Sequence, residues 1–206
     1  MGRLRALFLA AALVGWSFVT PRLPTALRLG LQAGVGGLLV LATRAGLGLR
    51  PPRLWAGLRT GSAVGAAAVG AVAATAWLPP VRASMAARAT PPSAPGWLLV
   101  RIPVGTVWAE EAAFRAALAG VASRAFGPNG GKALQAIAFG LSHVTDARST
   151  GEPVLPTVLV TGGAGWFFAW LAERSGSLAA PMLAHLAINE AGAVATLLVR
   201  RYRCAT

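Results

Sequence analysis

The sequence predicts an all-α fold, a polytopic transmembrane bundle of about 6–8 helices, and three observations support this. Of 206 residues, 55% are hydrophobic and 12% are charged, whereas about 25% of the residues of a soluble domain are charged. Apolar runs of helical length recur along the whole chain. Arginines stand mainly between these runs, where cations commonly flank membrane helices.

In the first half, apolar runs predict helices at about residues 4–19, 26–43 and 60–78. The first run follows Arg3 and Arg5, as a signal peptide would, but no small-x-small cleavage site follows it. We therefore interpret it as a transmembrane helix. Residues 44–59 are expected to form a loop, and Pro79-Pro80 to end the third helix. The third run is rich in Gly and Ala, which allow close helix packing in lipid.

A proline-rich stretch at residues 91–95 is interpreted as a linker. It divides one membrane domain into an N-terminal region, residues 1–95, and a core, residues 96–206. Helices are expected in the core near residues 96–125, 131–144, 155–172 and 178–199. A membrane span needs about 20 residues, so the 131–144 segment is expected to be buried or to cross only partly.

Two groups of arginines give conflicting indications of how the chain is oriented in the membrane. Those between residues 44 and 59 indicate a cytoplasmic loop, and those after residue 199 indicate a cytoplasmic C-terminus. Both cannot hold if all seven segments cross. The conflict would disappear if segment 131–144 did not cross.

The net charge of +13 comes from eighteen arginines and one lysine against six acidic residues. No basic stripe with interleaved aromatics accompanies this charge. Membrane lipid, rather than nucleic acid, is therefore the expected partner. The abundance of Ala, Gly and Arg suggests a bacterial genome, and thus the bacterial plasma membrane. The single cysteine, Cys204, excludes an intrachain disulfide.

The core contains acidic and histidine side chains, which are costly in a membrane and indicate function or pairing. In an α-helix, Glu111 and Arg115 would share a face and form an ion pair. Glu110 would point about 100° away and stay free. His185 and Asn189 are also four residues apart, so they would present two hydrogen-bond donors on one face.

Three short patterns occur here in order: Glu-Glu-x-x-x-Arg at residues 110–115, Phe-x-x-x-His at 139–143 and His-x-x-x-Asn at 185–189. Together they resemble the CPBP family, which includes CAAX prenyl protease 2 and bacterial Abi proteins. The resemblance covers residues 97–199 approximately. It implies an intramembrane endopeptidase that hydrolyses peptide bonds of a membrane-associated or tethered substrate, with its active site inside the C-terminal half.

The resemblance implies a role for each residue of these patterns. Glu110 would be the general base that activates water, and His143 would orient that water. His185 and Asn189 would stabilise the tetrahedral oxyanion. The remaining residues would support the site by holding helix geometry or by packing, and these are Glu111, Arg115 and Phe139. Acidic residues at segment ends are expected to be solvated, namely Asp146, Glu152 and Glu173.

These roles require no metal or other cofactor, and metal-free hydrolysis is the preferred interpretation. The sequence also lacks His-Glu-x-x-His, the helical zinc motif of many metalloproteases. A zinc-dependent version stays open, because Glu110, His143 and His185 could form a zinc site with an open position.

Two other functions remain as alternatives. One is a non-catalytic scaffold or immunity protein with the CPBP fold, although the intact patterns favour a peptidase. The other is a proton or ion carrier that uses buried Glu and His as a relay. A carrier would favour inverted repeats, and no internal repeat is visible. The substrate cannot be read from the sequence.

Overall fold

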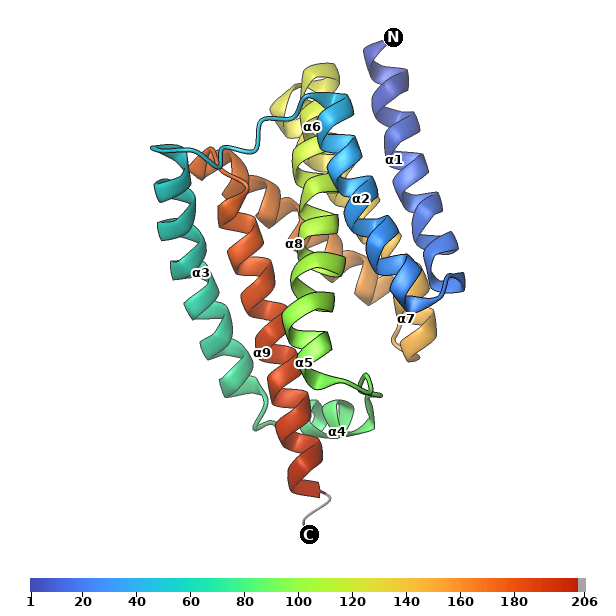
Figure 1. Cartoon of the computed structure of the whole chain (residues 1–206), viewed down its shortest axis with the longest axis vertical. Coiled ribbons are helices and arrows are strands. Elements are labelled where there is room, and N and C mark those ends of the chain that lie inside the picture. The colour runs from blue at the N-terminus through green and yellow to red at the C-terminus, as the bar shows by residue number, and fades with distance from the viewer. Residues whose placement is uncertain (204–206) are drawn as a thin grey trace.

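The computed structural model describes residues 1–203, which form a helical bundle without strands (Figure 1). The all-α prediction is thereby confirmed. The long α-helices are α1 (Gly2–Val19), α2 (Thr25–Thr43), α3 (Arg53–Thr75), α6 (Ala119–Ser142), α8 (Val154–Ser175) and α9 (Ala179–Arg203). Two π-helical segments, η2 (Trp97–Trp108) and η3 (Glu111–Leu118), lead into α6. The short elements are η1 (Thr20–Arg22), α4 (Pro79–Ala87), α5 (Ala94–Gly96) and α7 (Val144–Thr150).

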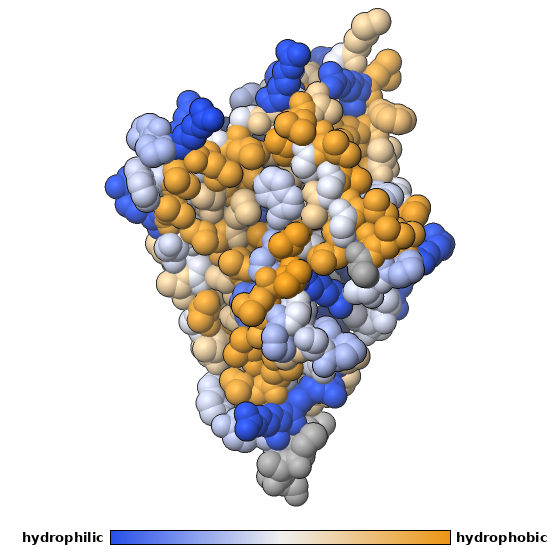
Figure 2. Space-filling view, in the orientation of Figure 1, coloured by the Kyte–Doolittle hydropathy of each residue, from blue (hydrophilic) through white to orange (hydrophobic). Residues whose placement is uncertain are grey.

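Within residues 1–203, three helices are long and apolar enough to cross a membrane: Gly2–Arg22, Val154–Ser175 and Ala179–Tyr202. A fourth candidate is the pair Arg53–Thr75 and Pro79–Ala87, which is bent by 97° and could form one broken span. Leu27–Thr43 is apolar but shorter. In Figure 2, apolar residues cover much of the middle of the visible face, and most hydrophilic residues gather toward its margins and ends.

The structure corrects two boundaries in the first half. Residues 44–59 do not form a loop throughout, because α3 begins at Arg53. Gly57 in this first part of α3 lies against Ser177 and Ala179, so packing on the start of α9 favours the helix. The second correction concerns Pro79-Pro80, which start the short helix α4. A proline is well tolerated in the first turn, where its missing N–H has no helical partner.

The predicted segments 96–125 and 131–144 are two parts of one long, broken helical path. Backbone angles of φ 78° and ψ 170° at Gly127 interrupt α6, and Pro128 follows. Only glycine adopts such a conformation readily, which accounts for a break between the two predicted segments. The sequence did not predict the π-helical winding before α6 or the short helix α7 after it.

Glycines on α3 let this helix approach α9 closely. Gly57, Gly61 and Gly65 are buried. A Cβ atom at Gly61 would lie 2.8 Å from the carbonyl oxygen of Ala180. This contact leaves no room for a side chain, and it agrees with the prediction that small residues mediate packing in this helix.

The two groups of arginines lie at opposite ends of the bundle. The Leu178 N–H donates to the Leu47 carbonyl at 2.9 Å, so the loop before α3 and the start of α9 are adjacent. Helix α9 then runs the length of the bundle to its other end (Figure 1). The two groups are therefore far apart along the bundle, and the side of the membrane that each faces stays a prediction.

Candidate active site

The π-helical winding surrounds Glu110. Ala109 and Glu110 are the residues between η2 and η3. π-Helical turns are rare and occur frequently at functional sites. The side chain of Glu110 is 28% exposed, whereas that of Glu111 is completely buried. Adjacent carboxylates thus meet different surroundings, as the sequence predicted, although the helix is not the α-helix on which that prediction was based.

The predicted ion pair between Glu111 and Arg115 is present. Arg115 Nε lies 3.2 Å from Glu111 Oε2, and both side chains are fully buried. The two atoms are close enough for an ion pair but are not aligned as a hydrogen bond. Aromatic rings complete the surroundings of the guanidinium, which lies 3.8 Å from the ring centroid of Phe139 and 5.1 Å from that of Phe168. This contact gives the cation a favourable partner where water is absent.

His185 lies between both glutamates, which the sequence did not predict. Its Nδ1 is 2.8 Å from Glu111 Oε1, and its Nε2 is 3.8 Å from Glu110 Oε2. The ring of Phe168 stacks on the imidazole with centroids 5.1 Å apart. The ionised Glu111 carboxylate can only accept hydrogen bonds, so Nδ1 of His185 carries a proton. In the neutral ring Nε2 then has the lone pair.

His143 is held by the backbone of its own helix. Its Nδ1 donates to the carbonyl oxygen of Phe139 at 2.7 Å. The Phe139 ring also packs edge-on against the imidazole, with centroids 4.6 Å apart. A carbonyl oxygen only accepts, so the proton of the neutral ring is on Nδ1 and Nε2 can accept a hydrogen bond. Phe139 thus supports the position of His143 through both its backbone and its ring.

Asn189 follows His185 by one helical turn in α9. Its Nδ2 donates one hydrogen bond to the backbone carbonyl of His185 at 3.1 Å. An amide nitrogen has two N–H groups, so the second remains available. Both side chains line the same cavity, as their spacing predicted.

A large cavity of about 620 Å³ brings the predicted site residues together. Glu110, His143, His185 and Asn189 all line it. Its walls come from η2, α6, α7, α8 and α9, and the outer part includes Arg88, Glu152 and Thr157. Motifs that lie up to 79 residues apart in the sequence therefore meet at one space large enough for part of a peptide.

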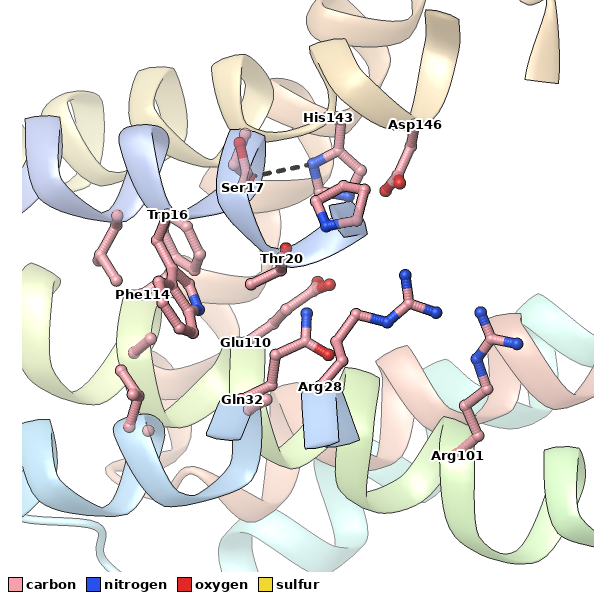
Figure 3. Close-up of a pocket in the computed structure, with 17 residues that line it drawn as sticks. Trp16, Ser17, Thr20, Arg28, Gln32, Arg101, Glu110, Phe114, His143 and Asp146 are labelled. Carbon is pink, nitrogen blue, oxygen red and sulfur yellow. Dashed lines mark hydrogen bonds between the residues drawn. The ribbon is translucent and has the colours of Figure 1, made fainter. Parts of the chain in front are cut away.

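A smaller polar chamber of about 170 Å³ adjoins the same residues (Figure 3). Glu110, His143 and Asp146 line both the chamber and the large cavity. Asp146 is exposed, as expected for a solvated residue, but its place in both walls was not predicted. In the sequence, only its position three residues after His143, on the same side of a helix, could have indicated this. The other polar lining residues are Ser17, Thr20, Arg28, Gln32, Arg101 and Ser142.

Metal dependence, including the zinc alternative, stays a prediction. Among the described residues, no three His, Cys, Asp or Glu side chains are grouped so that they could hold one metal ion. Glu110, His143 and His185 share a cavity but do not form such a group. Both imidazoles bond a protein oxygen through Nδ1, which leaves Nε2 as the ring nitrogen that could accept a hydrogen bond or bind a metal.

Residues 92–191 match the family model described as type II CAAX prenyl endopeptidase Rce1-like. The matched segment contains all three motifs, from Glu110 to Asn189. No curated protein and no solved structure matched the chain. The match confirms the resemblance of this segment to the CPBP-type intramembrane proteases. Together with the apolar helices, the match identifies an integral membrane protein.

Proposed function

We propose that the protein is an active endopeptidase that cleaves a membrane-associated or tethered peptide in the large cavity, with Glu110 as the general base. The observation that supports this most directly is the different placement of the two adjacent carboxylates. Glu110 reaches the cavity, whereas Glu111 is buried and paired with Arg115 and His185. Of these two adjacent carboxylates, Glu110 is the one that lines the cavity, which supports its assignment as the base.

The proposed reaction starts with a water molecule between Glu110 and His143. Glu110 accepts one proton of this water, and Nε2 of His143 accepts a hydrogen bond from the other. The water oxygen forms a bond to the carbonyl carbon of the peptide, and the electron pair of the C=O double bond moves to the carbonyl oxygen. A positioned base of this kind contributes typically 10²–10⁴ to the rate.

The resulting oxyanion would be stabilised by His185 and Asn189. Asn189 offers its second N–H. Because Nδ1–H of His185 is bonded to Glu111, Nε2 donates only when the ring is doubly protonated. In that form each ring nitrogen would face a carboxylate oxygen, Nδ1 that of Glu111 and Nε2 that of Glu110. When the C–N bond breaks, the leaving amine takes the proton held by Glu110.

We propose no step that involves a metal ion, since the three side chains of the zinc alternative act in this mechanism as a base, a hydrogen-bond acceptor for water and an oxyanion donor. The complete set of these residues favours catalysis over a non-catalytic scaffold or immunity role. We propose that the protein lies in a bacterial plasma membrane, with its active site within the hydrocarbon core of the bilayer.

The test is cleavage by the full chain reconstituted in lipid nanodiscs, using a library of membrane-anchored, fluorescence-quenched peptides. We expect the wild type to cleave some of them, and Glu110→Gln to lower kcat by about 10²–10⁴ without loss of folding. Glu173→Gln is the matched control, because Glu173 is exposed and pairs with Lys132 outside the site. If the Glu110→Gln variant kept full activity, Glu110 could not be the general base. A wild type that binds peptides without cleaving them would favour a scaffold.

A further inference from the structure

We propose that the small polar chamber supplies the hydrolytic water to Glu110 from the side opposite the peptide, and that Arg28 and Gln32 keep the chamber hydrated. This inference rests on the proposed function, because it assigns the source of a reactant in that reaction. It gives the N-terminal helices, which carry no recognised motif, a part in the site.

The need for a separate supply follows from the location of the site. The hydrocarbon core of a bilayer contains almost no water, yet each peptide bond that is hydrolysed consumes one water molecule. A peptide bound in the large cavity would occupy the space beside His185 and Asn189. Water that enters by the same route would then have to pass the substrate.

The chamber has the size and position that such a supply requires. Its volume is about 170 Å³, and a water molecule occupies about 30 Å³ in the liquid, so a few molecules fit. It extends from Thr20 and Pro21, at the turn between α1 and α2, to Glu110 and His143. Figure 3 shows the Glu110 carboxylate among the chamber side chains, with His143 and Arg28 nearby. The chamber therefore connects the proposed base to the turn between α1 and α2, which lies away from the peptide-binding cavity.

The polar side chains of α2 in this chamber lack protein partners. Arg28 and Gln32 are four residues apart and both half-buried. Neither side chain makes a hydrogen bond or an ion pair with another described residue. A guanidinium has five N–H donors and an amide has two. Since these half-buried donors line the chamber, water in the chamber would accept their hydrogen bonds.

Electrostatics also favours hydration. Arg28 acts on Arg101 as a like charge, and Asp146 acts on Arg101 as an opposite charge. No pair among these three side chains is close enough for a salt bridge. Water molecules between them would screen the repulsion and solvate each charge. Arg101, Asp146 and Pro21 are exposed, so this lining also reaches the surface of the protein.

Cysteine labelling in membranes tests hydration without any need for catalysis. The native cysteine is first replaced by Cys204→Ser. We then expect Gln32→Cys to react with a small hydrophilic methanethiosulfonate, and Leu38→Cys, an exposed apolar position on the same helix, to react far more slowly. Labelling of Gln32→Cys should persist when a cleaved peptide, identified in the library, is added in excess to the Glu110→Gln variant. Absence of labelling, or protection by the peptide, would overturn the proposal.

Kinetics test the supply of water to the reaction. We expect Gln32→Leu, which is apolar and of similar size, to lower kcat by about 10-fold or more without raising KM, because a displaced water loses its alignment. Gln32→Asn should recover part of this loss, and Leu38→Ala should behave as the wild type. Unchanged kcat in a folded Gln32→Leu protein, or a raised KM alone, would contradict the assignment. If no peptide is cleaved by the wild type, the labelling result still decides whether the chamber is hydrated.

Discussion

The imidazole of His185 is hydrogen-bonded to the carboxylate of Glu111 at 2.8 Å, across 74 residues of sequence. This bond joins η3 to α9 inside the bundle. It fixes the orientation of the ring, so that Nε2 lies on the side of Glu110. Glu111 is therefore in contact with a proposed catalytic side chain as well as with Arg115.

We predict that Glu111→Gln lowers kcat and also lowers the free energy of unfolding, because it leaves the buried Arg115 guanidinium without its anion. The amide can still accept a hydrogen bond from His185, but it removes the negative charge beside Nδ1 of the ring. An analogous neutralisation next to a catalytic histidine in serine proteases costs about 10⁴ in kcat, so a loss on the order of 10² or more is expected. Peptide cleavage and thermal unfolding should be measured on the same preparation. Normal kcat would limit Glu111 to a packing role.

Arg115→Ala should destabilise the bundle strongly. The substitution leaves the buried Glu111 carboxylate without its cation, and breaking a buried pair costs about 3–5 kcal/mol. Unfolding in detergent and the yield of monodisperse protein measure this effect. Arg174→Ala, at an exposed position of α8, is the control and should change the free energy of unfolding by less than about 0.5 kcal/mol. A stable but inactive Arg115→Ala protein would instead make Arg115 a substrate contact.

Helix packing predicts opposite effects for two glycines of α3. A Cβ at Gly61 would meet the Ala180 backbone at 2.8–2.9 Å, whereas nothing lies within 4 Å of a Cβ at Gly70. Gly61→Ala should therefore lower the free energy of unfolding by about 1–3 kcal/mol. Gly70→Ala should be neutral or slightly stabilising, because alanine favours helices. Equal thermal stability of the two variants would show that α3 does not pack on α9 in this way.

Asn189→Ala distinguishes oxyanion stabilisation from zinc catalysis. If Asn189 donates to the oxyanion, kcat should fall by about 10²–10³, which corresponds to 2.7–4 kcal/mol. KM should change little, because the lost bond strengthens only in the transition state. Wild-type cleavage should also survive prolonged chelation. A chelation-sensitive enzyme that zinc restores, combined with a mild Asn189→Ala defect, would contradict the metal-free mechanism.

Much of the architecture was predictable because membrane helices require long apolar runs. The runs located every long helix approximately, and the Gly127–Pro128 pair separated the two parts of the central one. The start of α3 at Arg53 was missed because polar arginines obscured it. Its helical state depends on packing of Gly57 against α9, which is a contact distant in sequence. The short helices α4 and α7 have too few residues to show a pattern.

The family resemblance named the candidate site residues together, but contacts between them were predictable only for residues at helical spacing. This applies to Glu111 with Arg115 and to His185 with Asn189. The bond between Glu111 and His185 could not be predicted, because it depends on how η3 packs against α9. The stacking of Phe168 on His185 has the same origin. Arg28 and Gln32 belong to the N-terminal region, which carries no recognised motif. No sequence signal therefore placed them near the site.

The π-helical winding on both sides of Glu110 has a consequence for insertions and deletions. Each π-type hydrogen bond spans one residue more than the α-helical bond. Removing one residue from η2 would allow an α-helical turn there, and the residues before it would rotate by about 100° relative to Glu110. A homologue with such a deletion would keep every motif residue and still turn Arg101, which lines the small chamber, and the helices before η2 relative to Glu110. The length of this segment therefore carries functional information that the motifs alone do not contain.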